Sequence, residues 1–344
     1  MKYRLPGKCL TTAMAIMPHT DLEAAMDIAL SMDVPFWPQL PKMRYHEDMY
    51  AQSSEKFPGL TIHTEEERIT FQRDQFYEEL PRHFEQCESP GYYELSEEYS
   101  IAFQDFMSRD LSGFQCIRGQ SVGPVSFGFK ITDEDRRPII YDDEIRPFMF
   151  EFMANKANAQ YRQLKKKNDT ALVWMDEPGL QMLFASFTGY TASAAARDYA
   201  DYMELLEGPR GIHLCGNPDW SFLLRDVAPD VLSMDSYSVG HVFTRYKEEV
   251  VDFLKSGSII AWGITPTLTE ELSAETFSSL VARLEEMFDY IAACGIDKDE
   301  LLDRSWLAPS RCCLVNPDRT RSVEQSFQLL REIAEYFKTK YHLD

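Results

Sequence analysis

The second half of the chain alternates between short apolar runs and amphipathic stretches, and this alternation constrains the fold more than any other feature. The apolar runs cover residues 112–117, 171–176, 211–215, 231–235, 258–264 and 305–309. The amphipathic stretches cover residues 142–166, 191–207, 243–255, 273–293 and 321–340. Short, continuously apolar strands separated by helices are typical of a parallel sheet whose outer side is covered by helices.

Two further candidate strands near the N-terminus, at 8–14 and 33–37, bring the total to eight, the number found in a (β/α)8 barrel. An open doubly wound sheet is the alternative, but its usual glycine-rich phosphate loop is absent from the sequence. Residues 40–105 are polar, charged and aromatic, and we interpret them as an insertion, a hairpin with helices that form a lid. The sequence therefore predicts one α/β domain over residues 1–344, a (β/α)8 TIM barrel with an insertion at about 40–105.

Charge and cysteine usage narrow the environment and the partners of the protein. A net charge of −21 disfavours binding to nucleic acid, because an acidic surface repels phosphate. No run of 18 apolar residues is present, so we expect no membrane partner, and the N-terminal residues do not resemble a signal peptide. Seven cysteines are an odd number over a long chain, which favours a reduced, cytoplasmic protein over a disulfide framework.

Polar residues follow several predicted strands, and in a parallel barrel such strand ends meet at one mouth. His213 and Cys215 are two residues apart on one strand, so their side chains share a face. Imidazole and thiolate are good zinc ligands, and Cys312 or Cys313 after the last strand would supply a third. Asp235, after the neighbouring strand, is a candidate fourth ligand. Three protein ligands and one exchangeable position are typical of catalytic zinc.

Simpler interpretations of these residues exist. An isolated histidine and cysteine on one strand are often a buried imidazole and a structural thiol. The second cysteine at another strand end shifts the balance towards a metal site. A disulfide between the adjacent residues 312 and 313 would be strained, and a reducing compartment disfavours it. The remaining cysteines have no nearby histidine or cysteine partner in the sequence and are interpreted as small hydrophobic residues.

Seven segments taken together resemble a known family. They are KCLTTAMAIMPHTD, RGQSVGPVSFG, MDEPGL, HLCGN, DVLSMDSY, WGITPT and APSRCCLVN. The chain resembles the catalytic C-terminal barrel of cobalamin-independent methionine synthase, within the superfamily that includes uroporphyrinogen decarboxylase and corrinoid-dependent methyltransferases. The resemblance extends over most of the chain and implies a barrel fold and a zinc site.

Carried over by position, the resemblance implies that His213, Cys215 and Cys312 bind zinc. Cys312 is preferred because it precedes Cys313 and a leucine, where the family has cysteine, glycine and leucine. An inserted arginine leaves Cys313 as the alternative. The acidic ligand falls on Asp235, where the family has glutamate, and the shorter side chain makes a three-coordinate site the other possibility.

The resemblance also implies substrate-binding residues. Asp176 matches the carboxylate that holds the substrate amino group and is the leading catalytic candidate, and the adjacent Glu177 is a second substrate-binding candidate. Glu65, within TIHTEEER, resembles another carboxylate that binds the amino group, although such a glutamate run is more often a solvated surface. His19, at the end of the first strand, is a candidate proton shuttle or an ordinary polar residue at the mouth.

These similarities imply a zinc-dependent methyltransferase with a small-molecule thiol, homocysteine-like, as acceptor. The chain has no room for the second barrel of the full-length enzymes, so it resembles the short versions whose donor is a methylated corrinoid protein. A lyase like uroporphyrinogen decarboxylase is an alternative, but that family's signature is not reproduced. A non-catalytic barrel with a closed four-ligand zinc site is the other alternative.

Overall fold

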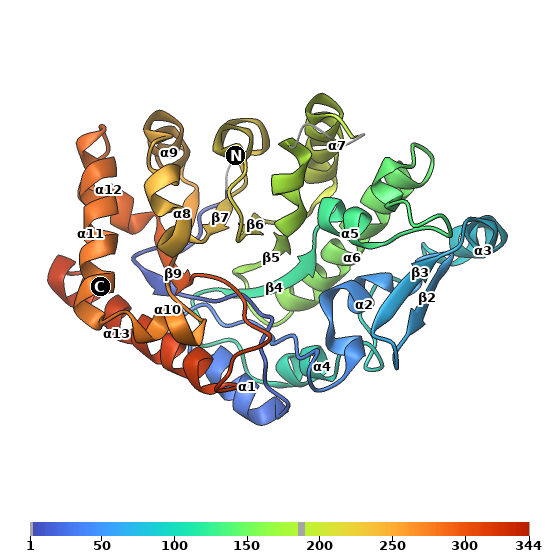
Figure 1. Ribbon diagram of the computed structural model, residues 1–344, viewed down its shortest axis with the longest axis horizontal. Coiled ribbons are helices and arrows are strands. Elements are labelled where there is room, and N and C mark those ends of the chain that lie inside the picture. Colours follow the sequence, from blue (N-terminus) through green and yellow to red (C-terminus); the bar gives the residue numbers. More distant parts are fainter. Residues whose placement is uncertain (1–2, 185–189, 344) are drawn as a thin grey trace.

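The computed structural model describes residues 3–184 and 190–343 and is built around a curled parallel sheet. Its seven strands follow the order β1-β9-β8-β7-β6-β5-β4, and every neighbouring pair is parallel. They are β1 (Leu10–Thr11), β4 (Ile117–Val122), β5 (Ala171–Asp176), β6 (Arg210–Leu214), β7 (Val231–Met234), β8 (Ile259–Thr265) and β9 (Ser305–Pro309). The strands lie at the centre of Figure 1 with helices around them, as an α/β barrel requires.

The chain between the two edges of this sheet is an extended segment, residues 34–39. Val34 donates its backbone N–H to Thr11 on β1 (2.9 Å), and Arg118 on β4 donates to Pro35 (3.0 Å). The eighth strand predicted at 33–37 is therefore a set of isolated bridges and not a regular strand. The reason is local, because Pro35 and Pro38 have no N–H to donate to a ladder. The sheet is thus a half-barrel of seven strands.

Other predicted strand boundaries also need correction. The apolar run 112–117 mostly precedes the strand, and β4 occupies 117–122. The strand predicted at 8–14 is reduced to two residues, because Lys8 and Cys9 both have left-handed backbone conformations, with φ of 63° and 56°. The runs at 171–176 and 305–309 coincide with β5 and β9.

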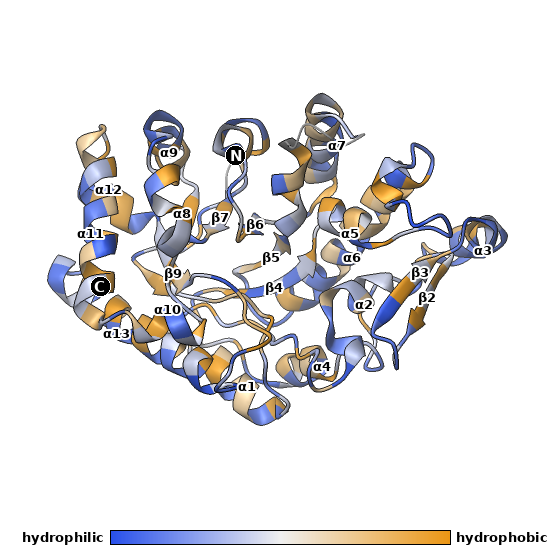
Figure 2. Cartoon of the chain, in the orientation of Figure 1, coloured by the Kyte–Doolittle hydropathy of each residue, from blue (hydrophilic) through white to orange (hydrophobic). Residues whose placement is uncertain are grey.

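Helices cover the outside of the sheet. After the strands come α5 (Pro124–Lys130), α6 (Ile145–Lys165), α7 (Ala192–Leu205), α8 (Ser236–Phe243), α9 (Lys247–Lys255), α10 (Thr269–Ser273), α11 (Phe277–Ala293), α12 (Lys298–Asp303) and α13 (Arg321–Tyr341), with α1 (Leu22–Leu30) after β1. The apolar residues of α13 that recur at helical spacing are buried, as predicted. Blue and orange residues alternate along these helices in Figure 2. Within 3–184 and 190–343, no helix is both long and apolar enough to cross a bilayer.

The insertion contains the predicted hairpin and helices. It comprises the 3-10 turn η1 (Tyr45–Glu47), α2 (Met49–Ser54), the antiparallel strands β2 (Leu60–His63) and β3 (Arg68–Phe71), α3 (Arg73–Gln86), and then α4 (Ile101–Ser108). Buried Glu47 joins the start of this segment to its end, because its carboxylate accepts hydrogen bonds from Ser100 Oγ (2.7 Å) and Ile101 N (2.6 Å). The hairpin and α3 lie at the margin of the molecule in Figure 1, and a lid function stays a prediction.

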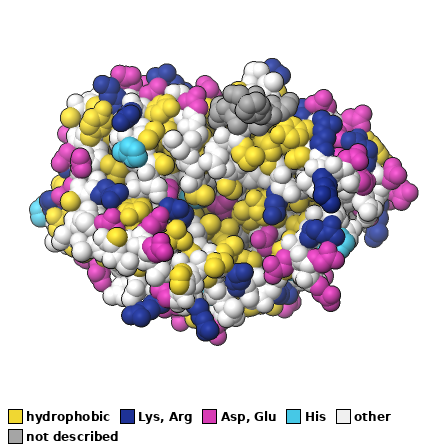
Figure 3. All heavy atoms as spheres, in the orientation of Figure 1, with side chains coloured by type: hydrophobic (Ala, Val, Ile, Leu, Met, Phe, Trp, Pro, Cys, Tyr) yellow, Lys and Arg dark blue, Asp and Glu magenta, His cyan; other side chains and the backbone are white. Residues whose placement is uncertain are grey.

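Two apolar clusters fill the molecule. The larger lies between the sheet and its helices, and the smaller consists of Leu5, Leu10, Val34, Cys116, Leu172, Val231, Ile259, Ala261 and Trp306. Most of the smaller set comes from the amino ends of the strands, so it fills the bottom of the barrel. Side chains alternate along a strand, so the next inward positions towards the carboxyl ends are occupied by Trp174, His213 and Ser233. Hydrophobic side chains also gather at the centre of the face shown in Figure 3, inside a rim of charged groups.

Candidate functional site

The polar residues after β5, β6, β7, β8 and β9 meet at one end of the sheet. Asp176 is in register with His213 across β5 and β6, and Glu177 N donates to the His213 carbonyl (2.8 Å). On the other side, Thr267 Oγ1 donates to the Arg311 carbonyl (3.1 Å). The structure thus brings together the strand ends that the sequence placed at a common mouth, because parallel strands share their carboxyl edge.

A contact with Ser233 on β7 orients the His213 ring, and one ring nitrogen has no partner among the described residues. The His213 side chain is buried, and Nδ1 lies 2.9 Å from Ser233 Oγ on β7. Nε2 is buried and has no hydrogen-bond partner among the described residues. Burial and the nearby Arg118 guanidinium lower the pKa of His213 to about 3, which keeps the imidazole neutral. A neutral imidazole whose Nδ1–H donates to a neighbour presents a lone pair on Nε2, as metal-binding histidines do.

Two thiols share this region. Burial raises the pKa of Cys312 to about 12, with Cys215 and Asp176 adding to the shift through their charges. The pKa of Cys215 is raised by burial and by Asp176 and Asp235. Cys313 is different, because it packs into the larger apolar cluster and its Sγ donates to the Val315 carbonyl (3.5 Å). Of the two adjacent thiols, Cys312 is thus the one within electrostatic range of Cys215.

The donor set fits zinc by its chemistry. All seven cysteines, each within the described ranges, are free thiols, and His213 offers an unpaired buried nitrogen. One imidazole and two thiols are ligands that zinc prefers. Within residues 3–184 and 190–343, however, no group of three or more His, Cys, Asp or Glu side chains is arranged closely enough to hold a metal. Zinc binding therefore stays a prediction that would require these side chains to rearrange.

Asp235 has partners that compete with a role as zinc ligand. One carboxylate oxygen accepts the Ser238 N–H (2.8 Å) and caps α8. The other lies 3.5 Å from Arg311 Nη2. Arg311 also contacts Glu271 (3.0 Å), so this arginine links the ends of β7 and β9 to α10. These contacts give Asp235 a structural role, and its role as a fourth zinc ligand stays a prediction.

Asp176 is a buried carboxylate without a partner. Its exposed fraction is 4%, and neither oxygen has a hydrogen-bond partner in the described parts of the chain. Burial raises the pKa of Asp176 to about 7, although the Arg118 guanidinium opposes that rise. An unpaired buried carboxylate is costly, and an ammonium group from a ligand would relieve that cost.

Glu177 differs from Asp176 in having hydrogen-bond partners. The residue is fully buried, and its oxygens accept hydrogen bonds from Val125 N (3.1 Å), Ser126 N (2.8 Å) and Ser126 Oγ (2.6 Å). These donors belong to the first turn of α5, so Glu177 satisfies a helix N-terminus, and a role in substrate binding stays a prediction. The sequence motif MDEPGL contains both Asp176 and Glu177, and it does not show which carboxylate is unpaired and which caps a helix.

The two remaining candidates lie further from the thiols along the chain. His19 is buried, with Nε2 3.3 Å from Glu324 Oε1 on α13, and burial lowers its pKa. Its Nδ1 has no partner among the residues described, so the shuttle role stays a prediction. Glu65 is exposed in the turn between β2 and β3, and no hydrogen bond or ion pair joins it to a described residue of the mouth.

Sequence reasoning missed three residues of this site. Arg118 is fully buried on β4, with its guanidinium 3.6 Å from the centre of the Trp174 ring, and Thr12 accepts its Nε–H (3.0 Å). Ser233 orients His213. Burial raises the pKa of Tyr50, on α2, and the charges of Asp48, Glu177 and Asp176 add to this rise, which puts Tyr50 within electrostatic range of the site. The period of two along β7, which gives residues 233 and 235 one face, could have identified Ser233; Tyr50 carried no comparable signal.

Replacing Ser233 with alanine should weaken metal binding about 10- to 100-fold, because the His213 ring would lose the contact that fixes its orientation. A zinc titration against a chromophoric chelator measures this change. Ser236→Ala is a matched control, since Ser236 is buried at the same end of the sheet and contacts the Gly263 carbonyl. Equal zinc affinity in the Ser233 variant and wild type would show that His213 does not bind the metal.

Fold and site together define an α/β half-barrel with imidazole, thiol and carboxylate groups at the carboxyl ends of its strands. No family model and no curated protein matches the sequence. Among solved structures, the fold is similar to a methyltransferase from Methanosarcina mazei, with a TM-score of 0.60 and 12% identity, over 97% of this chain and 94% of that chain.

A second similar structure is a B12-independent methionine synthase from Shewanella sp. W3-18-1, in complex with selenomethionine. Its TM-score is 0.55 with 12% identity, over 98% of this chain and 99% of that chain. At this level of identity, the two similarities show a shared fold.

Proposed function

We propose that the chain is a single-domain, zinc-dependent methyltransferase with a homocysteine-like thiol as its methyl acceptor. The observation that supports this proposal is that His213, Cys215 and Cys312 lie at or just after the carboxyl ends of β6 and β9, where the buried His213 Nε2 has no partner among the described residues. The names of the similar structures, a methyltransferase and a methionine synthase, support methyl transfer. Selenomethionine in one of them is a methylated amino acid, which supports an amino-acid acceptor.

His213, Cys215 and Cys312 would hold the metal. A bound zinc ion lowers the pKa of a coordinating thiol and so supplies a thiolate near neutral pH. Ser233 keeps the His213 ring in place. Asp176 binds the acceptor ammonium group, and this contact holds the acceptor with its sulfur near the three ligands. The buried position of Asp176 strengthens this ion pair, because water screens it poorly.

The contacts of Asp235 favour an open zinc site over a closed, non-catalytic one. A closed site needs a fourth protein ligand, and the Asp235 carboxylate already contacts Ser238 and Arg311. Three protein ligands leave one position for the acceptor thiol. In a cobalt-substituted sample, the visible spectrum should change when homocysteine is added; an unchanged spectrum would indicate a closed site.

A methylated corrinoid protein is the proposed methyl donor. The chain carries 56 acidic and 35 basic residues, and this negative surface would attract a donor protein with a basic docking face. Methylcobalamin can replace the protein as a soluble donor in an assay. Transfer from a methylated corrinoid protein that slows steeply with added salt would support docking by charge.

Metal content and methyl transfer to homocysteine together test the proposed function. We expect near-stoichiometric zinc in wild type, and loss of zinc and activity in His213→Ala, Cys215→Ser and Cys312→Ser. Cys313→Ser is the matched control, because Cys313 packs into the apolar cluster, and it should retain both. Wild-type protein that takes up no zinc, or a Cys312 variant that keeps its zinc and activity, would contradict the proposed site.

A further inference from the structure

A cavity lies at the end of the half-barrel opposite the thiols, where the strands begin. Its volume is about 360 Å³. The N-terminal segment, the end of α12 and the C-terminal part of α13 form most of its wall. Asp33, just before the 34–39 segment, and Gln115, just before β4, complete it. Its polar lining residues are Arg4, Lys8, Asp33, Gln115, Asp303, Arg304 and Lys338. Leu5, Pro6, Leu10 and Leu343 form an apolar part of the wall. This size is that of a small-molecule site.

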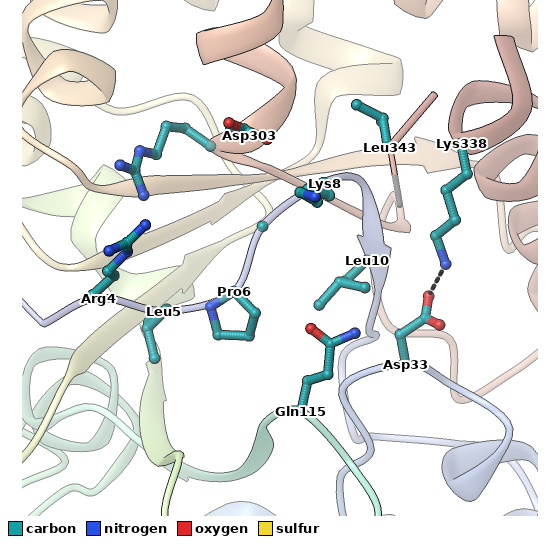
Figure 4. Close-up of a pocket in the computed structure, with 12 residues that line it drawn as sticks. Arg4, Leu5, Pro6, Lys8, Leu10, Asp33, Gln115, Asp303, Lys338 and Leu343 are labelled. Carbon is teal, nitrogen blue, oxygen red and sulfur yellow. Dashed lines mark hydrogen bonds and ion pairs between the residues drawn. The ribbon is translucent and has the colours of Figure 1, made fainter. Parts of the chain in front are cut away.

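The charge of this cavity is opposite to that of the whole chain. Acidic residues exceed basic ones by 56 to 35 over the sequence, whereas four basic residues and two acidic residues line the cavity. One of the acidic residues is already engaged, because Asp33 Oδ2 accepts from Thr11 N, Thr11 Oγ1 and Lys338 Nζ, each at 2.9 Å. Figure 4 shows this ion pair at one side of the cavity. The remaining lining therefore carries an excess of positive charge.

Two of these cations have no carboxylate partner within residues 3–184 and 190–343. No ion pair or hydrogen bond joins the guanidinium of Arg4 or Arg304 to an acidic side chain in the described ranges. Arg304 Nε is also buried, and it has no hydrogen-bond partner among the residues described. A buried, unpaired guanidinium nitrogen is unfavourable, and an anion that enters the cavity would satisfy it. In Figure 4, Arg4 lies on one side of Pro6 and Gln115 on the other.

The cavity wall is held in place before any ligand binds. Trp306 Nε1 donates to the Pro6 carbonyl (2.6 Å), and Lys8 N donates to the Leu302 carbonyl (3.1 Å). A Cβ atom on Gly7 would lie 1.8 Å from the Asp303 carbonyl oxygen, so the backbone here packs closely against the end of α12. A wall fixed in this way reduces the entropy cost of binding.

We propose that this cavity binds a small organic anion, with its anionic head between Arg4 and Arg304 and a short apolar part against Leu5, Pro6 and Leu10. The site is separate from the thiols, because it lies at the amino ends of the strands and they lie at the carboxyl ends. Phosphate and carboxylate heads share the chemistry that bidentate guanidinium groups recognise. The ligand would join the first and last segments of the barrel, so binding should stabilise the fold.

Thermal unfolding in the presence of inorganic phosphate or citrate tests the proposal, with chloride used to keep the ionic strength constant. At least one of the two anions should raise the unfolding temperature of wild type saturably. Arg304→Gln and Arg4→Gln should each weaken the apparent affinity at least tenfold. Arg331→Gln, an exposed change on α13 outside the cavity, should leave it unchanged. The stronger of the two anions identifies the head group.

Two further results would overturn the proposal. One is the absence of saturable stabilisation by both anions, and the other is equal affinity in the Arg304, Arg4 and Arg331 variants. Cys215→Ser separates this site from the proposed methyltransferase site, because it removes a predicted zinc ligand and leaves the cavity intact. Anion binding should persist in Cys215→Ser. Its loss in this variant would show that the anion binds near the thiols and not in the cavity.

Discussion

Asp176→Asn is expected to abolish most methyl transfer and at the same time to stabilise the folded protein. Asparagine has nearly the same shape but no charge to pair with the acceptor ammonium group. Loss of one partner of a buried charge pair costs about 2–5 kcal/mol, so kcat/KM should fall roughly 100-fold or more. The wild-type carboxylate is buried and has no partner among the described residues. Removal of its charge should therefore stabilise the folded protein when no ligand is bound.

The gain in stability should depend on pH in a defined direction. The pKa of Asp176 rises from 3.8 to about 7 on folding, so between these values the folded protein binds more protons than the unfolded chain. The unfolding free energy of wild type therefore falls as pH rises from about 4 to about 7. At about 1.36 kcal/mol per pH unit, the charge costs on the order of 4 kcal/mol at pH 8 and almost nothing at pH 4.

Chemical denaturation of metal-free protein at pH 4, 6 and 8 measures this difference. Asp176→Asn should be more stable than wild type at pH 8, and the two curves should converge towards pH 4. Asp201→Asn, an exposed change on α7, is the control and should follow wild type throughout. A variant that is less stable than wild type at pH 8 would show that the Asp176 charge is compensated within the fold.

Glu177→Ala should have the opposite effect on stability. Removal of the carboxylate leaves the Val125 and Ser126 donors of α5 without an acceptor in a fully buried position, and it also leaves a cavity. We expect a loss of about 3–5 kcal/mol in the free energy of unfolding. Denaturant titration measures the loss. Correctly folded molecules at low temperature should keep the wild-type KM for homocysteine, because the side chain is turned towards α5.

Glu177→Gln provides the matched comparison, since it keeps the volume and one acceptor oxygen. It should lose less stability than the alanine variant, by roughly half, because only part of the cap is removed. A glutamine variant with wild-type stability and a tenfold higher KM would restore the original sequence-based prediction, that Glu177 binds substrate. The two neighbouring carboxylates thus allow a direct comparison between an acid proposed to bind substrate and an acid that caps a helix.

The parts of the fold that sequence patterns predicted best are those whose environment is uniform. The strands at 171–176 and 305–309 are covered on both faces, so their apolar runs mark their bounds. The apolar pattern did not predict the bounds of β4, because the inward face of this strand carries Arg118 and Gln120. A buried strand with polar residues has no continuous apolar run to mark it. The pattern also failed at 33–37, where prolines interrupt the ladder but the chain still connects both edges of the sheet.

The candidate site also has features that sequence patterns predicted and features that required the structure. The spacing of His213 and Cys215 alone indicated that they share one face, because side chains alternate along any strand. The choice between Cys312 and Cys313 required the structure, since adjacent residues after a strand differ only in which direction the loop turns them. Cys312 lies near Cys215, and Cys313 packs into the core.

The sequence by itself determined the parallel α/β architecture and the strand end that carries imidazole and thiol groups. Both follow from periodicity over a few residues, which local backbone geometry enforces. Only the tertiary structure decided which carboxylate is unpaired. Asp176, Glu177 and Asp235 are chemically alike, but α5 supplies donors to Glu177 and Arg311 approaches Asp235, whereas the described chain offers Asp176 no partner. Those partners are distant in sequence, and chain folding alone brings them within the few ångströms over which hydrogen bonds and ion pairs act.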